Sequence, residues 1–386
     1  MTKKYKIVYC TPSLYIPGGV ERVLTTKANY FADVLGYDIY IVLTDGKGKT
    51  PYYPLSSKIH LIYLDINFEE LWNKKFIYKS LLYLKKQSAY KRELTRILIE
   101  LKPDITISLL RREINFITSI KDGSIKIGEL HVNRNNYRNF EGGDSNIFKR
   151  FFSKLWMNDL QKKLIELDRF VVLTNEDKDN WKELSNVTVI NNPLSQEPRN
   201  ISSLKSKRVI AVGRYVYQKG FDLLIDAWVN IVKKHGDWQL YIFGPGDREL
   251  YIDMAKKLKI IDNCHLNGAV KDINTEYADS SIFAFSSRFE GFGMVLVEAM
   301  ACGLPCVSFD CSCGPKDIID DGKNGFLIND FDINDFSEKL NFIIENQELR
   351  ESMAHNALLS SKKYTIDEIG DKWKSLFDEL YSMHKI

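Results

Sequence analysis

Short apolar runs alternate with longer amphipathic segments along this chain. The runs are rich in Val, Ile, Phe and Tyr and predict buried strands, whereas the segments repeat apolar side chains every three or four residues and predict helices. The strands predicted in the first half are Tyr5–Thr11, Ile39–Thr44, His60–Leu64, Ile105–Leu109, Lys126–His131, Arg169–Thr174 and Val187–Asn191. The helices predicted between them are Gly19–Leu35, Trp72–Leu101, Asn146–Glu166 and Glu176–Leu184. This alternation is typical of βαβ units and predicts a mostly parallel sheet.

The alternation stops at Asn191–Leu194 and starts again after a polar stretch without periodicity, residues 195–206. The second series of predicted strands is Arg208–Gly213, Leu240–Gly244, His265–Leu266, Ile282–Ser286, Pro305–Phe309 and Gly325–Ile328, and an amphipathic helix, Ile366–Met383, follows it. We therefore predict an α/β protein with two doubly wound domains, residues 1–193 and 194–365, and a C-terminal helix within residues 366–386. Such sheets bind ligands outside the carboxyl ends of their strands, so we expect the site in a cleft between the two domains.

The most specific stretch is Phe285–Ala299, in which Glu290 and Glu298 stand eight positions apart. A Gly-Phe-Gly turn between them opens a predicted helix, and a helix N-terminus presents N–H groups and a partial positive charge to phosphate. The N–H groups concerned belong to Phe292, Gly293, Met294 and Val295. The two acids could also be the catalytic pair of a glycoside hydrolase, but their place beside a phosphate-type turn favours hydrogen bonds to sugar and ribose hydroxyls.

Two cations and two further glycines fall at neighbouring strand ends. Gly213 and Arg214 follow the strand that opens the second domain, and Lys219 comes shortly after them. Arginine offers a planar fork and lysine a point charge to a diphosphate, although a solvated basic loop is the plain alternative. Gly244 ends the next strand, where a simple turn would explain it nearly as well.

The first domain contributes a glycine pair and a histidine. Gly18 and Gly19 follow the first strand and begin the first helix, where the backbone can approach a phosphate or a sugar. The pair lacks the G-x-G-x-x-G spacing of a dinucleotide site, and a plain strand-to-helix turn is the alternative. His131 ends a predicted strand at the same edge and is either a structural histidine or a member of the site. Glu129 competes with it as the polar group but lies deeper in the strand.

Composition excludes several classes of protein. The chain of 386 residues is too long for one ordinary core, and its 27% of charged residues is normal for a globular protein. It shows no apolar run long enough for a bilayer and no signal peptide, so we expect a cytosolic protein, or one attached to the membrane from the cytosolic side. A group of four cysteines suggests zinc, but paired ligand spacing is absent and buried thiols are favoured. The group consists of Cys302, Cys306, Cys311 and Cys313.

Charge is divided unevenly along the chain. Residues 1–193 contain 31 basic and 22 acidic side chains, a net charge of +9, and the remainder contains 23 and 29, a net charge of −6. Basic side chains interleave with aromatic ones in Trp72–Arg96 and again in Phe148–Trp156. Such segments suit an anionic membrane surface, and an ordinary solvated helix face is the alternative. Nucleic acid is not an expected partner because no nucleic-acid-binding module accompanies the charge.

These motifs together resemble the family-4 retaining glycosyltransferases of the GT-B fold along nearly the whole chain. The resemblance rests on an ordered set of positions: Gly18-Gly19-Val20-Glu21, His131, Val171–Thr174, Asn192-Pro193, Gly213-Arg214, Lys219-Gly220 and the pair Glu290 and Glu298. It implies two Rossmann-like domains facing across a cleft, with the final helix crossing back onto the first domain. Asp317 stands where the family often has Glu, and the chain looks like a bacterial subset that builds capsular, exopolysaccharide or lipid-linked glycans.

The resemblance also implies a role for each matching residue. In the second domain, Arg214 and Lys219 would bind the diphosphate, Glu298 the ribose and Glu290 the donor sugar. In the first domain, His131 would line the donor-sugar pocket.

The backbone of Gly19 would meet the donor as well. The implied reaction is retaining transfer of a hexose or N-acetylhexosamine from a nucleoside-diphosphate sugar, with uridine as the implied base. The implied acceptor is a glycan or a polyprenyl-diphosphate-linked glycan. Because residues 1–193 are basic, we expect this first domain to bind the acceptor and the second domain to bind the nucleotide sugar. No cofactor or metal is expected, since no D-x-D element stands at a strand end. A nucleotide-sugar epimerase of the same fold and a non-catalytic sugar-nucleotide-binding protein are the alternatives.

Overall fold

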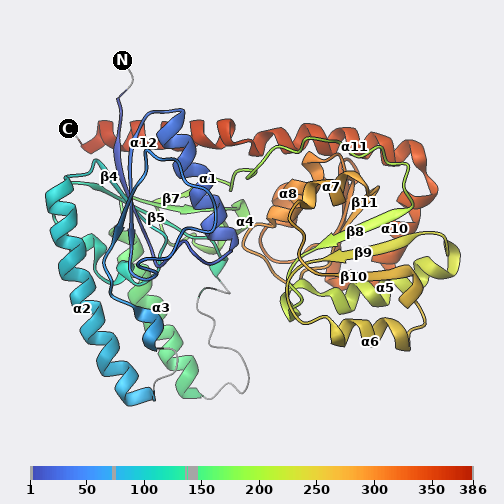
Figure 1. Ribbon diagram of the computed structural model, residues 1–386, viewed down its shortest axis with the longest axis horizontal. Helices are drawn as coiled ribbons and strands as arrows, with labels where there is room; N and C mark the ends of the chain where they lie inside the picture. The colour runs from blue at the N-terminus through green and yellow to red at the C-terminus, as the bar shows by residue number, and fades with distance from the viewer. Residues whose placement is uncertain (1–2, 72–74, 135–136, 138–146, 385–386) are drawn as a thin grey trace. The chain divides into compact units, whose positions relative to one another are not determined.

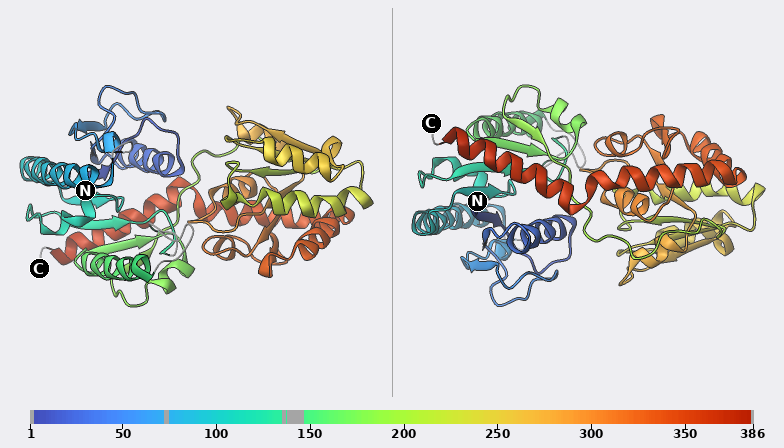
Figure 2. Two further views of the ribbon diagram at one scale, coloured as in Figure 1. Left: turned by 90° about the horizontal axis from the view of Figure 1, so that it is seen from below. Right: turned by 90° about the horizontal axis from the view of Figure 1, so that it is seen from above.

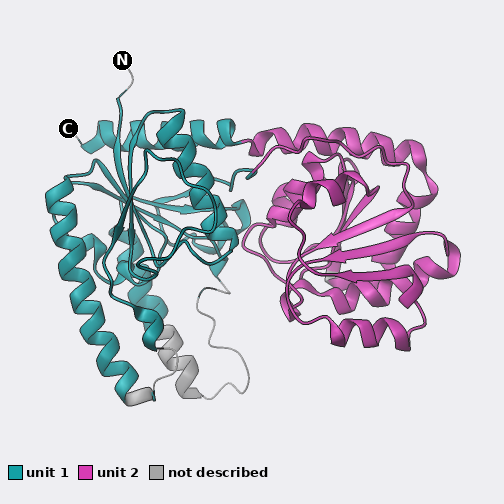
Figure 3. Ribbon diagram, viewed as in Figure 1, with its two compact units in different colours: residues 1–195, 366–386 teal, residues 196–365 magenta. Residues whose placement is uncertain are grey.

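The computed structural model describes residues 3–71, 75–134, 137 and 147–384 (Figure 1). The chain divides into two compact units (Figure 3). Unit 1 consists of residues 1–195 together with 366–386, and unit 2 consists of residues 196–365. Each unit is a parallel sheet with helices on both faces, which confirms the predicted α/β doubly wound fold.

The sheet of unit 1 has seven parallel strands in the order β3-β2-β1-β4-β5-β6-β7. The strands are β1 (Lys6–Thr11), β2 (Asp38–Leu43), β3 (His60–Tyr63), β4 (Ile105–Ser108), β5 (Ile125–Glu129), β6 (Arg169–Val172) and β7 (Val187–Val189). Every residue of β4 and β5 is buried, although polar residues such as Thr106 and Lys126 alternate with isoleucine in both strands. The strand order reverses between β1 and β4.

Helices cover both faces of this sheet. They are α1 (Gly19–Asp33), α2 (Phe76–Leu101), α3 (Ile147–Ile165), α4 (Asn175–Asn180) and α12 (Ile366–His384). The helices α1 and α12 lie side by side on one face, where Phe31, Trp373 and Phe377 share one core (Figure 2). Leu94 of α2 and Leu164 of α3 belong to the core on the other face. The C-terminal helix thus packs on unit 1, as expected.

Unit 2 repeats the plan with six parallel strands in the order β10-β9-β8-β11-β12-β13. The strands are β8 (Arg208–Val212), β9 (Gln239–Phe243), β10 (Cys264–Asn267), β11 (Ile282–Phe285), β12 (Cys306–Phe309) and β13 (Gly325–Ile328). The helices are α5 (Phe221–Lys234), α6 (Glu249–Lys257), α7 (Ile273–Ala278), α8 (Met294–Ala301), α9 (Pro315–Ile318), α10 (Ile333–Glu345) and α11 (Gln347–Ser361). The strand order reverses between β8 and β11.

The predicted ends of one strand and one helix are wrong, and each error misplaces a side chain. The strand predicted to end at His131 ends at Glu129, so the histidine lies in the loop beyond it. The helix predicted over 176–184 ends at Asn180, because Trp181 turns into the core and packs edge-on against Phe170, with ring centroids 5.2 Å apart. The basic segment 148–156 lies almost entirely outside the residues whose side chains are described, as do residues 72–74.

A close contact between α1 and α12 allows the docking of α12 to be tested. A Cβ atom at Gly370 would come within 2.2 Å of the Tyr30 ring. We expect Gly370→Leu to force the helices apart, at a cost of about 2 kcal/mol, and to lower the midpoint of thermal unfolding by about 5 °C. Differential scanning calorimetry measures this. Because Tyr30→Ala makes room, the same substitution in that background should cost much less, and an equal loss there would contradict the account.

Candidate active site

The predicted donor-binding residues of unit 2 meet at the carboxyl edge of its sheet, where the strand order reverses. Gly213 and Arg214 follow β8, and Glu290 lies in the segment that joins β11 to α8. The reversal of strand order is the place where open α/β sheets bind ligands. The topology therefore brings together residues that are about 75 positions apart in the sequence.

A lysine and a carboxylate form an ion pair at this edge. The Nζ of Lys219 lies 2.6 Å from Oε1 of Glu290, and their side chains are only 14% and 9% exposed. The aliphatic stem of Lys219 packs against Gly213, where a Cβ atom would lie 3.0 Å from it. From the sequence, Lys219 was expected to bind the diphosphate and Glu290 the donor sugar, and their ion pair was not predicted. The pair presents one positive and one negative group at one place.

Two glycines allow the strand ends to approach each other closely. Gly220 has φ +60°, and a Cβ atom there would lie 2.0 Å from the carbonyl oxygen of Ser286. A Cβ atom at Gly244 would lie 1.7 Å from the carbonyl oxygen of Gly213. The Ser286 hydroxyl donates a hydrogen bond to the carbonyl of Lys219 at 2.9 Å. Main-chain contacts thus fix the loops that carry the two predicted cations.

The helix α8 places a buried carboxylate beside the same turn. Gly293 is its N-cap, with φ +92°, and the first turn begins with Met294 and Val295, whose N–H groups face the N-terminal end of the helix. Glu298 is 7% exposed, and the Tyr277 hydroxyl donates a hydrogen bond to its Oε2 at 3.4 Å. The tyrosine orients the carboxylate, and sequence reasoning did not identify it.

The two arginines of this region differ in their surroundings. Arg288 donates two hydrogen bonds to Asp222, one of them 2.8 Å long, and its guanidinium lies 4.1 Å from the centre of the Tyr217 ring. Arg214 is exposed, and among the described residues no carboxylate forms an ion pair with it. Arg214 is therefore the cation open to an anionic ligand. The Phe292 side chain is buried, which leaves its backbone as the part that a ligand could meet.

In unit 1, Gly18 and Gly19 differ in the space around them. Gly18 is the N-cap of α1 in an extended conformation that any residue adopts, but a Cβ atom there would lie 2.1 Å from Oε2 of Glu21. Glycine at this position therefore leaves room for the Glu21 carboxylate. A Cβ atom at Gly19 would meet no described atom within 4 Å, so its backbone is open to a ligand.

His131 belongs to a buried polar cluster. Its Nε2 lies 3.3 Å from Oε1 of Glu129, and Lys27 of α1 donates a hydrogen bond to the same carboxylate. Lys27 and Glu129 are each 1% exposed. Burial by itself would raise the pKa of the Glu129 carboxyl, but the charges of Lys27 and His131 outweigh burial and lower that pKa to about 2. Trp373 of α12 covers the ammonium group of Lys27 at 4.5 Å.

The cluster also contains polar atoms that the described chain does not satisfy. Neither ring nitrogen of His131 makes a hydrogen bond to a described residue, and the same holds for Oε2 of Glu129 and the hydroxyl of Tyr9. Buried polar atoms of this kind normally have a partner, so the cluster suits a polar ligand or bound water. The sequence does contain a signal for Lys27, because it interrupts the apolar face formed by Leu24, Ala28 and Phe31.

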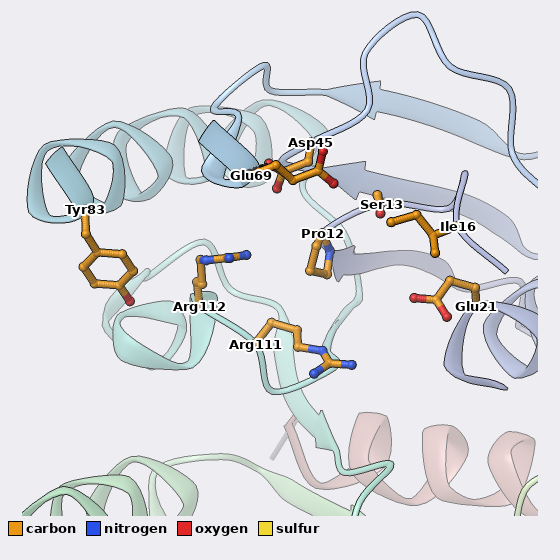
Figure 4. A pocket seen from close by; sticks show the side chains of 9 residues that line it. All are labelled: Pro12, Ser13, Ile16, Glu21, Asp45, Glu69, Tyr83, Arg111 and Arg112. Carbon is orange, nitrogen blue, oxygen red and sulfur yellow. Dashed lines mark hydrogen bonds between the residues drawn. The ribbon is translucent and has the colours of Figure 1, made fainter. Parts of the chain in front are cut away.

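A cavity of about 560 Å³ opens at the carboxyl edge of unit 1 (Figure 4). Its charged lining side chains are Glu21, Asp45, Glu69, Arg111 and Arg112. Figure 4 shows these side chains pointing into a common space from several different loops. Sequence reasoning assigned the acceptor to this half of the chain on charge alone and named none of these five residues as a ligand.

The cysteines have surroundings that suit structural thiols. All six are buried and free of disulfide bonds. Burial raises the pKa of Cys302 to about 12, so its thiol stays protonated at neutral pH. Within the described ranges, no three His, Cys, Asp or Glu side chains gather in a way that could hold a metal ion.

Comparison with known proteins adds a family and a fold. Residues 195–359 match the family model described as glycosyl transferases group 1. An uncharacterized glycosyltransferase of Haemophilus influenzae is 29% identical over 379 residues, which cover 96% of this chain and 99% of the relative. The amylovoran biosynthesis glycosyltransferase AmsD of Erwinia amylovora is 34% identical over 223 residues, which cover 55% of this chain and 62% of the relative.

Solved structures share the architecture at low sequence identity. The crystal structure of TarM superimposes with a TM-score of 0.77 at 19% identity and covers 97% of this chain and 99% of that one. A Staphylococcus aureus TarM mutant in complex with fondaparinux, alpha-GlcNAc-glycerol and UDP gives a TM-score of 0.75 at the same identity and coverage. The two parallel-sheet units therefore have the GT-B fold. The family match over residues 195–359 and the similarity to the Haemophilus influenzae glycosyltransferase along nearly the whole chain identify it as a glycosyltransferase. Its second unit belongs to the glycosyl transferases group 1 family.

The buried ion pair of unit 1 makes a stability prediction. We expect Lys27→Met to destabilise the protein by about 3 kcal/mol, because it leaves the Glu129 charge buried without its counterion. Protonation of Glu129 would remove that charge, so the deficit should shrink as the pH is lowered from about 7 to about 5. Urea unfolding at the two pH values measures this.

The double variant Lys27→Met/Glu129→Gln is the control, since it removes both charges. It should be more stable than Lys27→Met alone. In the unchanged protein, the stabilisation from the low pKa of Glu129 is complete above pH 4.5 and is lost as the pH falls toward 2. A deficit in Lys27→Met that is independent of pH would contradict the pairing.

Proposed function

We propose that this protein is a retaining glycosyltransferase that moves a hexose or N-acetylhexosamine from a UDP-sugar to a hydroxyl of a bacterial surface glycan or lipid-linked glycan. The observation that carries the proposal is the Lys219–Glu290 ion pair next to the exposed Arg214 at the carboxyl edge of unit 2. The ion pair offers a cation to a diphosphate and a carboxylate to the hydroxyls of the attached sugar. Glu298, which lies on α8 just over one turn from its N-cap, would accept hydrogen bonds from the ribose hydroxyls.

The reaction breaks the bond between the anomeric carbon and the diphosphate oxygen and forms a bond to the acceptor oxygen on the same face. Negative charge develops on the departing diphosphate. Arg214, Lys219 and the N–H groups at the start of α8 would stabilise that charge. The acceptor proton passes to the departing phosphate oxygen, so the proposal needs no side-chain nucleophile and no metal ion.

Relatives support the pathway and the nucleotide. One relative acts in amylovoran biosynthesis, and the TarM mutant contains UDP together with alpha-GlcNAc-glycerol. These names support a uridine nucleotide, a sugar donor and a polysaccharide product for this chain. The expected place of action is the cytosol or the cytosolic surface of the membrane. The described helices include none long and apolar enough to span a bilayer.

Nucleotide binding can be tested by thermal shift with UDP-, GDP- and ADP-sugars. We expect a UDP-sugar to raise the unfolding midpoint most, and Glu298→Ala to abolish the shift, because the ribose loses its carboxylate. The control is Glu338→Ala, which removes an exposed carboxylate from α10 of the same unit. An undiminished shift in Glu298→Ala would refute the role of this residue.

The chemistry can be tested with Lys219→Met. We expect kcat/KM to fall by a factor of about 10²–10³, as for the loss of one preorganised group that stabilises developing charge. Lys323→Met is the matched control, since Lys323 is an exposed lysine of the same unit. Product NMR should show the donor's anomeric configuration, and excess EDTA should leave the rate unchanged. If the donor alone is converted to a new sugar nucleotide, the protein is an epimerase instead.

We also propose that α2 attaches the enzyme to anionic membranes. Tyr78, Leu81 and Leu84 are 58%, 65% and 64% exposed, and exposed lysines of the same helix lie among them. An apolar strip with adjacent ammonium groups suits the boundary between lipid headgroups and acyl chains.

Vesicle sedimentation tests the membrane proposal. The protein should bind vesicles of phosphatidylcholine mixed with phosphatidylglycerol at low salt, and Leu81→Glu combined with Leu84→Glu should release it. Ile99→Glu is the control because Ile99 is 54% exposed near the other end of α2. Two outcomes would exclude this mode of attachment. One is that the double variant binds the anionic vesicles as well as the unchanged protein does, and the other is that the unchanged protein binds vesicles of phosphatidylcholine alone equally well.

A further inference from the structure

The cavity of unit 1 lies where the strand order of its own sheet reverses. Pro12 and Ser13 follow β1, while Arg111 and Arg112 follow β4, which are the two strands on either side of the reversal. Open parallel sheets bind ligands at this position. A volume of about 560 Å³ also falls within the usual range of about 300–1,000 Å³ for small-molecule sites. Unit 1 therefore has a cavity of its own at the position where such sheets bind ligands.

Adjacent arginines form one side of the cavity. Figure 4 shows both guanidinium groups directed at the open space. The Arg112 guanidinium lies 4.3 Å from the centre of the Phe68 ring, and among the described residues no carboxylate forms an ion pair with it. Stacking on a ring holds the planar group in place and leaves the N–H donors at its edge available.

A buried glutamate anchors the loop that carries these arginines. Glu113 is 1% exposed, and its Oε1 accepts hydrogen bonds from the backbone N–H of Arg111 at 3.0 Å and from the Ser108 hydroxyl at 2.7 Å. The Tyr90 hydroxyl lies 3.4 Å from the other oxygen, Oε2. The hydrogen bonds of Glu113 thus fix the loop that places both arginines at the cavity.

The carboxylates on the opposite side are partly engaged by the protein. Asp45 accepts hydrogen bonds from the backbone N–H of Glu69 at 3.0 Å and from the Thr44 hydroxyl at 2.6 Å. Glu69 accepts a hydrogen bond from the Tyr15 hydroxyl. A carboxylate has about four lone-pair sites, so each of these groups can still accept from a hydroxyl of a ligand.

We propose that this cavity binds the acceptor as a saccharide that carries an anionic substituent, either a phosphate ester or a uronate. Arg111 and Arg112 bind the anion, while Asp45, Glu69 and Glu21 accept hydrogen bonds from the sugar hydroxyls. The proposal rests on the proposed transferase function and names its acceptor class. The net charge of +9 over residues 1–193 would also attract such a molecule at long range.

The test is an array of bacterial surface oligosaccharides that includes neutral, phosphorylated, uronate-containing and amino-sugar members, probed with the full chain. Bound members should be anionic, and their identity distinguishes phosphate from uronate. For the best member, Arg112→Gln should weaken affinity about tenfold or more, as should raised salt, while Arg112→Lys should weaken it less. Arg92→Gln, which changes an exposed arginine of α2, should leave affinity unchanged.

The UDP-induced thermal shift is measured on the same variants. It depends on unit 2, so a normal shift in Arg112→Gln verifies the fold and separates this proposal from the proposed function. Equal binding of neutral or amino-sugar members, no binding to the array, or full affinity in both Arg112→Gln and Arg111→Gln would overturn the acceptor assignment. If UDP does not raise the unfolding midpoint of the unchanged protein, that result would instead count against the transferase function.

Discussion

A parallel sheet ends all its strands at one edge, and this constraint organises both units. Strands on either side of the reversal of order connect to helices on opposite faces, so that part of the edge stays uncovered. In unit 1 the uncovered part lies between β1 and β4, and in unit 2 it lies between β8 and β11. The cavity residues of unit 1 and the predicted donor residues of unit 2 fall at these two positions. The side chains proposed to bind substrates thus lie mainly on loops, while the sheets determine where those loops meet.

Each unit also holds a lysine–glutamate pair at its carboxyl edge. Lys27 and Glu129 are almost completely buried, whereas Lys219 and Glu290 retain limited contact with solvent. The difference matches different tasks. A fully enclosed pair is costly to break, while a partly exposed pair can exchange one partner for a ligand group. The first pair therefore stabilises unit 1, and the second belongs to the proposed substrate site.

Much of the fold was predictable because several strands buried on both faces, such as β11 and β12, appear as mainly apolar runs. Most predicted strand ends agree with the structure within one or two residues. The glycine positions were also predictable, since turns at strand ends require them. The ion pairs between distant side chains were not predictable from the sequence. Lys27 meets Glu129 across 102 residues, a contact that only the packing of α1 on β5 creates. Arg111 and Arg112 do not stand out in the sequence, and only the structure shows that both line one cavity.

The position of α12 has a consequence for the order of folding. Ile369, Trp373 and Phe377 are completely or almost completely buried in the core of unit 1, yet all of unit 2 precedes them in the chain. During synthesis, the face of α1 that α12 will cover stays exposed to water until unit 2 has been made. Lys27 lacks its Trp373 cover during that time. The half of the enzyme with the arginine-lined cavity is therefore completed last, although most of it is synthesised first.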